Sequence, residues 1–106
     1  MRVLFDQGTP VPLRGLLVGH EVTTAHELGW STMKNGDLLA AAEAAGFEIF
    51  VTTDGNLRYQ QNLATRVIAV VVLSTTSWPR IEAASAVIGK AVNEAAPRSF
   101  IEVSIP

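Results

Sequence analysis

The chain has 106 residues, of which 48% are hydrophobic and 17% charged, and its formal net charge is −2. This length predicts a single domain over residues 1–106, and the composition is too apolar for an intrinsically disordered chain. The slightly acidic charge balance argues against strong binding to duplex nucleic acid. The sequence has no cysteine, which excludes disulfides, thiolate metal sites and cysteine nucleophiles.

The sequence predicts a cytoplasmic protein without a membrane span. Three apolar residues lie between Arg2 and Asp6, too few for the core of a signal peptide. The longest apolar run, Val67–Leu73, has the length of a strand, whereas a membrane span needs about 20 residues.

In the first half of the chain, strand-like and helix-like patterns alternate. Pro10 and Pro12 suit the first turn of a helix, where the missing N–H had no partner. Asn35 is a favourable N-cap, and Gly46 is a favourable stop for the helix that Asn35 would begin. The predicted elements are a strand at Val3–Phe5, a helix at Leu13–Leu17, a strand at Glu21–Thr24, one helical turn at Ala25–Leu28 and a helix at Gly36–Ala45.

The second half continues this alternation, which predicts βαβ units and a mostly parallel sheet. The predicted fold is α/β, a three-layer α/β/α sandwich with about five strands, and its fourth strand is continuously apolar because both faces are covered. The predicted elements are a strand at Glu48–Thr53, a helix at Asn56–Leu63, a strand at Val67–Leu73, a helix from Pro79 to about Ala95 and an edge strand at Ser99–Ile105.

Aspartates follow two of the predicted strands. Asp6 follows the first strand and Asp54 the third, and ligands of an open parallel sheet bind beyond the carboxyl ends of its strands. If these strands are neighbours, both carboxylates face one crevice, with Asp37 in the first turn of the preceding helix as a third candidate. Clustered carboxylates repel one another unless a cation lies among them, and Mg²⁺ and Mn²⁺ prefer oxygen ligands. Such a site could activate water for phosphodiester hydrolysis.

Each aspartate also has a structural interpretation. Asp6 could cap the helix that follows it, and Asp54, in Thr-Asp-Gly-Asn, suits a turn. Asp37 is favourable near the positive end of a helix dipole. The presence of Asp at the ends of two strands favours the metal site more than either residue does alone.

Other polar side chains are predicted at the same edge. His26 and Glu27 follow the second strand and are candidate ligands or bases. Arg58 could contact a phosphate as a bidentate donor, or lie on a solvated helix face. His20 is predicted in a turn, and the aromatic residues expected to serve in packing are Trp30, Tyr59 and Trp78. The sequence contains no Walker loop, no G-x-G-x-x-G and no G-x-S-x-G elbow.

The order of three motifs carries a family resemblance. V-L-F-D-x-x-x-P at the N-terminus, G-H-E-V in the second strand and V-T-T-D before a short helix resemble the PIN-like domain proteins of the DUF5615 type. The resemblance extends from Met1 to about Leu73. It implies an α/β/α fold and a ribonuclease that depends on Mg²⁺ or Mn²⁺. It also implies the toxin half of a pair with an antitoxin protein, as for many members.

The resemblance carries the metal-ligand role to specific positions. It matches Asp6 to the aspartate of the first strand and Asp54 to that of the later strand, with Asp37 as the surviving carboxylate of the middle helix. Amides stand where these relatives often have carboxylates, at Gln7, Asn35 and Asn56. An amide keeps one acceptor oxygen but no charge, so metal binding is expected to weaken.

Two functions therefore remain open. In the first, a metal-dependent ribonuclease, Asp6, Asp37 and Asp54 hold the metal directly or through water. The residues expected to orient water or substrate phosphate are Gln7, Asn35, Asn56 and Arg58. In the second, the chain is a catalytically weakened module that binds protein or RNA. A phosphohydrolase with an aspartate nucleophile is a third, weaker possibility, because Asp6-Gln7-Gly8 lacks the D-x-D motif.

A homodimer is also predicted. The final strand, Ser99–Ile105, would leave a sheet edge open, and open edges pair with other chains.

Overall fold

The centre of the molecule is a five-stranded sheet in which every strand pair is parallel. The computed structural model describes residues 1–57 and 66–106, and the strand order is β2-β1-β3-β4-β5. This confirms the predicted α/β class. The strands are β1 (Arg2–Phe5), β2 (Glu21–Thr24), β3 (Ile49–Thr52), β4 (Ala69–Leu73) and β5 (Phe100–Val103).

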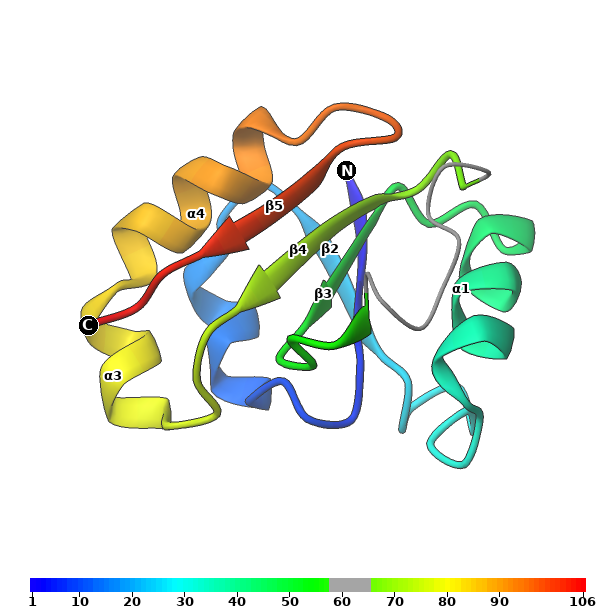
Figure 1. Cartoon of the computed structure of the whole chain (residues 1–106), viewed down its shortest axis with the longest axis horizontal. Coiled ribbons are helices and arrows are strands. Elements are labelled where there is room, and N and C mark those ends of the chain that lie inside the picture. The colour runs from blue at the N-terminus through cyan, green and yellow to red at the C-terminus, as the bar shows by residue number, and fades with distance from the viewer. Residues whose placement is uncertain (58–65) are drawn as a thin grey trace.

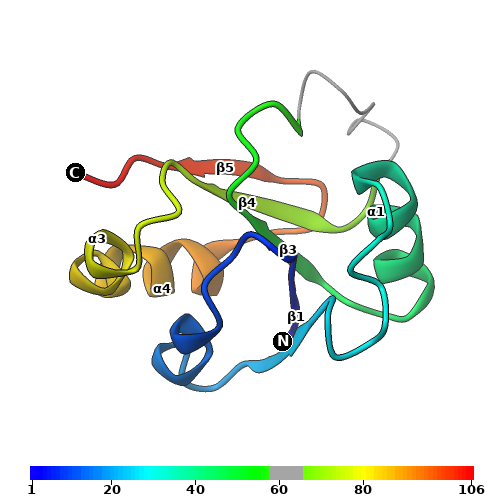
Figure 2. The ribbon, with the colours of Figure 1, turned by 90° about the horizontal axis from the view of Figure 1, so that it is seen from below.

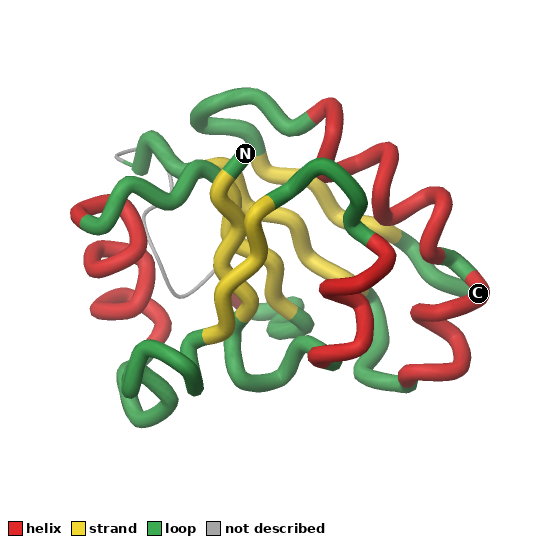
Figure 3. The backbone as a smooth tube through the Cα atoms, turned by 180° about the vertical axis from the view of Figure 1, so that it is seen from behind, coloured by secondary structure: helices red, strands yellow, loops and turns green. Residues whose placement is uncertain are grey.

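Helices cover both faces of this sheet (Figures 1 and 2). A 3-10 helix, η1 (Val11–Leu16), lies on one face with α3 (Trp78–Ala83) and α4 (Ser85–Glu94). The other face is covered by α1 (Asn35–Ala44). Figure 3 shows the same layers from behind, with α1 on one side of the strands and η1, α3 and α4 opposite.

Alternate residues of the central strands pack into two separate hydrophobic cores. On β1, Val3 and Phe5 face η1, α3 and α4, whereas Leu4 faces α1. On β3, Val51 joins the first core and Phe50 the second. Full burial of each such side chain stabilises the fold by about 1.5–3 kcal/mol. Coverage of both faces explains why these strands are continuously apolar.

The first half of the chain departs from the predicted helices in three places. The helix predicted at Leu13–Leu17 is the 3-10 helix η1, which begins and ends earlier. Residues 25–28 form turns rather than a helical turn. The N-cap of α1 is Lys34, and Asn35 is already the first residue of the helix. The Asn35 amide nitrogen instead donates a hydrogen bond to Asp54 across the sheet edge. Gly46 ends this helix as predicted, with a left-handed φ of 85° that glycine adopts without strain.

The last predicted helix is divided in two. Ala84 separates α3 from α4, because its N–H bonds to the carbonyls of both Arg80 and Ile81 and tightens the turn there. Proline occupies the first turn of α3, as predicted for Pro79. The predicted helix at Asn56–Leu63, with Tyr59, lies mostly outside the described residues. No helix among the described residues is long and apolar enough to cross a membrane.

The strand order places the topological switch point between β1 and β3. The connection that leaves β1 leads to β2 on one side, and the chain then returns to place β3 on the other side of β1. Loops that leave neighbouring strands in opposite directions open a crevice at the carboxyl ends, where such sheets bind ligands. Asp6 and Asp54 follow these two strands.

Candidate functional site

Asp6 and Asp54 belong to one hydrogen-bonded cluster at the switch point. Asp6 follows β1 directly, and its N–H donates to the Val51 carbonyl of β3 at 3.1 Å. Thr52, the last residue of β3, is fully buried and lies between the two aspartates. Its hydroxyl donates to Asp6 Oδ2 at 2.5 Å and accepts from the Asp54 N–H at 3.0 Å. The first condition of the predicted site, neighbouring strands, is therefore met.

Thr9 contacts the second oxygen of Asp6. Its Oγ1 lies 2.6 Å from Asp6 Oδ1 and 3.1 Å from the Val51 carbonyl oxygen. A hydroxyl has one proton, so an ionised Asp6 leaves two acceptors to share it. A protonated Asp6 can instead donate to Thr9, whose hydroxyl then donates to Val51. Burial raises the pKa of Asp6 above its ordinary value of 3.8, and the charge of Asp54 adds to this increase, whereas the hydrogen bonds from Thr52 and Thr9 oppose it.

The raised pKa of Asp6 predicts how stability depends on pH. A group that binds its proton more tightly in the folded chain stabilises the fold below its unfolded pKa and loses this contribution as pH rises through its folded pKa. The stability of Asp6→Asn relative to the wild type should therefore increase as pH rises from about 4 toward neutrality. Thermal unfolding of both proteins across that range checks this. A stability difference that does not change with pH would contradict it.

A glycine allows the loop after β1 to approach β3. A Cβ added at Gly8 would lie 2.7 Å from the Thr53 hydroxyl oxygen, closer than real side chains approach. A larger residue at position 8 would therefore force the Thr53 side chain or the loop that carries Asp6 and Thr9 to shift.

Asp54 forms a turn and also binds α1. Its Oδ1 accepts from the Asn56 N–H at 3.0 Å, the hydrogen bond of an Asx turn, so the structural interpretation of Asp54 is confirmed. Its Oδ2 accepts from Asn35 Nδ2 at 2.7 Å, which joins the start of α1 to the end of β3. The cap interpretation of Asp6 is wrong, because the N-cap of η1 is Pro10 and Asp6 contacts Thr9 and Thr52 instead.

The remaining predicted residues lie around this cluster. Asp37 is exposed in the first turn of α1, where its charge suits the helix dipole. The side chains of Gln7 and Asn56 are exposed, and Arg58 lies outside the described residues. Within residues 1–57 and 66–106, no group of three or more His, Cys, Asp or Glu side chains is arranged to hold a metal ion. Only Asp6 and Asp54 among the three predicted ligands are joined by hydrogen bonds.

Two pockets meet at Asp6 and Gln7. The smaller, about 170 Å³, lies toward α1, and its lining includes Asn35 and Trp30. The larger, about 420 Å³, lies toward η1 and β2, and its lining includes the exposed His26. His20, in contrast, lies at the other end of β2, where its Nε2 is 2.5 Å from Asn93 Oδ1. The aromatic side chains of Trp30 and Trp78 pack against the two cores, as predicted.

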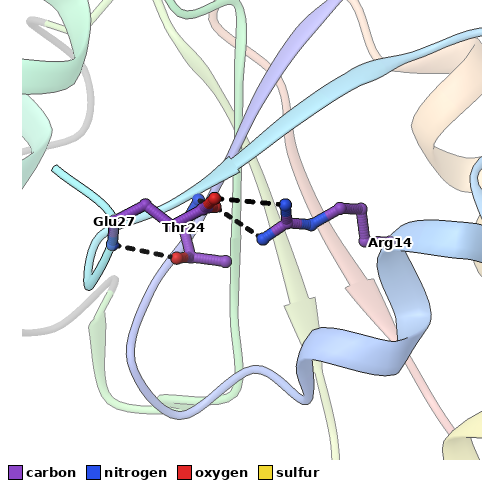
Figure 4. Close-up of polar contacts among 3 residues, drawn as sticks. All are labelled: Arg14, Thr24 and Glu27. Atoms are coloured by element: carbon purple, nitrogen blue, oxygen red, sulfur yellow. Dashed lines mark hydrogen bonds and ion pairs between the residues drawn. The ribbon is translucent and has the colours of Figure 1, made fainter.

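An ion pair that the sequence analysis missed lines the larger pocket (Figure 4). Arg14 of η1 binds Glu27 through both terminal nitrogens, at 2.5 and 3.3 Å. Glu27 and Thr24 also exchange hydrogen bonds, from the Thr24 N–H to Glu27 Oε1 and from the Glu27 N–H to the Thr24 hydroxyl. The hydrogen bond from Arg14 lowers the pKa of Glu27. The spacing T-x-x-E is that of a capping box, which is the signal that could have predicted the contact between Glu27 and Thr24.

The donor set around Asp6 and Asp54 fits a small divalent cation in kind. Two carboxylates and the amide oxygen of Asn35, whose nitrogen donates to Asp54, are hard ligands, as Mg²⁺ and Mn²⁺ require. Mg²⁺ is often held by one or two carboxylates, with water and substrate phosphate completing its coordination. Against this, each of the four carboxylate oxygens already accepts a protein hydrogen bond. A cation would therefore bind weakly until a substrate adds its own oxygens.

The fold and this edge define the class of protein: an α/β protein with an all-parallel sheet of order 2-1-3-4-5 and a pair of linked aspartates at its switch point. Comparison with known proteins returned no family model, no curated protein and no solved structure that matches the chain. The resemblance to PIN-like proteins therefore stays a prediction from sequence motifs.

Proposed function

We propose that this chain is a ribonuclease of the PIN-like type that depends on Mg²⁺ or Mn²⁺. The observation that carries the proposal is the position of Asp6 and Asp54 at the ends of neighbouring parallel strands, joined through the Thr52 hydroxyl. Carboxylates at this position can hold a cation against substrate in the crevice of the sheet. RNA, rather than another phosphodiester, is proposed from the resemblance alone.

The proposed roles follow from where the side chains lie. Asp6 and Asp54 would hold the cation, and the Asn35 amide would orient Asp54 and offer its own oxygen. Asp37 would act through water. The cation would activate a water molecule and stabilise the charge that develops on the scissile phosphate. Gln7, beside Asp6 in both pockets, would hydrogen-bond water or phosphate.

The deciding experiment is a titration of Mn²⁺ into the purified protein by calorimetry. We expect binding in about the millimolar range, because only two carboxylates contribute charge. The double variant Asp6→Asn/Asp54→Asn should not bind. Trp30 lines the smaller pocket, so Mn²⁺ should also quench its fluorescence in a Trp78→Phe background, which removes the other of the two tryptophans. Binding that survives in the double variant would place the cation elsewhere and refute the proposed site.

One observation favours a second candidate, a non-catalytic module that binds RNA or protein on the same fold. The oxygens of Asp6 and Asp54 serve Thr9, Thr52, Asn35 and the turn at Asn56, which is a structural use that needs no metal. No Mn²⁺ binding in the presence of a non-cleavable RNA analogue would favour this candidate. Pairing with an antitoxin protein would then be tested by co-purification. The predicted homodimer would be tested by sedimentation.

A further inference from the structure

The larger pocket beside Asp6 contains one permanent positive charge among its described lining residues, and that charge is Arg14. Its guanidinium faces the Glu27 carboxylate with two parallel N–H donors, the geometry in which arginine also binds phosphate. Arg14 thus already presents a fork of donors to an oxyanion, and that oxyanion is supplied by the chain itself (Figure 4).

The Arg14–Glu27 ion pair lies where solvent can reach it. The side chains are 37% and 46% exposed. Because water screens exposed ion pairs, they stabilise a fold only slightly, and a competing anion can displace the carboxylate at small cost. The Arg14 Nε is buried and has no hydrogen-bond partner among the described residues, so the contact with Glu27 leaves one guanidinium donor unsatisfied.

Glu27 does not depend on Arg14 for its position. Its Oε1 accepts from the Thr24 N–H at 2.9 Å, and its own N–H donates to the Thr24 hydroxyl at 3.1 Å. The turn after β2 therefore holds this carboxylate in place whether or not the guanidinium is bound. Arg14, in contrast, extends from η1 across the pocket to reach it (Figure 4).

We propose that Arg14 is the phosphate-binding residue of this pocket and that Glu27 is an internal carboxylate that competes with the phosphate for it. The ligand class is a phosphate oxyanion, either free or in the backbone of a single-stranded nucleic acid. The inference deepens the proposed function by placing the substrate phosphate beside Asp6, which lines the same pocket. Phosphate binding itself needs no metal, so it is measured independently of cleavage.

The test measures binding of inorganic phosphate and of a short single-stranded RNA to the full chain in EDTA. Glu27→Gln keeps the acceptor for the Thr24 N–H but removes the competing charge, so both affinities should rise about two- to fivefold. Arg14→Gln should weaken both at least about tenfold. Arg14→Lys keeps the charge but loses the paired donors of the guanidinium, so its affinities should lie between those of the wild type and of Arg14→Gln. Thermal unfolding verifies that each variant is folded.

Glu21→Gln is the matched control, because it removes the same charge from an exposed residue at the opposite end of β2. It should leave both affinities close to those of the wild type. Binding of RNA but not of inorganic phosphate would assign the site to the nucleic-acid backbone, and comparable binding of both would assign it to phosphate in general. Equal effects of Glu27→Gln and Glu21→Gln, or unchanged binding in Arg14→Gln, would overturn the inference. If the wild type binds phosphate as expected but neither binds Mn²⁺ nor cleaves RNA, only the proposed function would be overturned.

Discussion

Asp6→Asn is expected to lower Mn²⁺-dependent RNA cleavage at least about 100-fold while it raises the thermal stability of the protein at neutral pH. The loss follows because an amide has no charge with which to hold the cation. The gain follows because the introduced asparagine can accept from Thr52 through its oxygen and donate to Thr9 through its amide, and Thr9 then donates to Val51. This is the hydrogen-bond pattern of a protonated Asp6, without the cost of a partly buried charge. Cleavage assays and thermal unfolding of the same preparation measure both effects.

Asp37→Asn is the control for this prediction. It removes an equal charge from an exposed position of α1, so cleavage should fall by far less and stability should change little. Cleavage that survives in Asp6→Asn would show that Asp6 does not hold the cation. If Asp6→Asn were less stable than the wild type at neutral pH, the ionised Asp6 carboxylate would not cost the fold any free energy.

Thr52→Val is expected to destabilise the fold by about 2 kcal/mol and to lower its melting temperature by about 10 °C. Valine has the shape of threonine but no hydroxyl. It leaves Asp6 Oδ2 without the donor, and the Asp54 N–H without the acceptor, that Thr52 supplies. Because Thr52 is fully buried, water cannot easily replace either partner. The same change should lower metal-dependent cleavage, since both aspartates lose the side chain that aligns them.

Thr52→Ser separates these effects from simple loss of packing. Serine keeps the hydroxyl and removes a methyl group, so it should retain most of the cleavage and cost about 1 kcal/mol. Denaturant unfolding of the two variants gives the comparison. If the Thr52→Val and Thr52→Ser proteins were equally stable and equally active, the Thr52 hydroxyl would have no part in the site.

The strands and the site edge were predictable because each depends on local sequence. β2 has the predicted bounds, and the other strands lie inside the predicted segments or extend them by one residue. That Asp6 and Asp54 would meet required the strand order as well, which no local pattern contains. Asn35 illustrates the limit: its identity favours an N-cap, but its partner is Asp54, which lies 19 residues away. A local preference was overridden by a tertiary contact.

The contacts that shape the site could not be predicted for a related reason. Thr9 and Thr52 are hydroxyl residues of a kind found throughout loops and strands, and their role appears only when β1 lies beside β3. The contact between Arg14 and Glu27 depends on where η1 crosses the sheet. Amide and hydroxyl side chains bind many partners, so their sequence context alone does not select one.

The pairing of β1 has a consequence for how the chain folds. β1 pairs with β2 and with β3, so Arg2 lies beside Glu21 and Val3 beside Ile49. Closing such long loops costs entropy before any pairing energy is recovered, which makes this topology slow to nucleate. Asp6 and Thr52, which are 46 residues apart, come together only when β3 docks. A chain emerging from the ribosome therefore carries no assembled site until β3 and Asp54 have been synthesised and have docked beside β1.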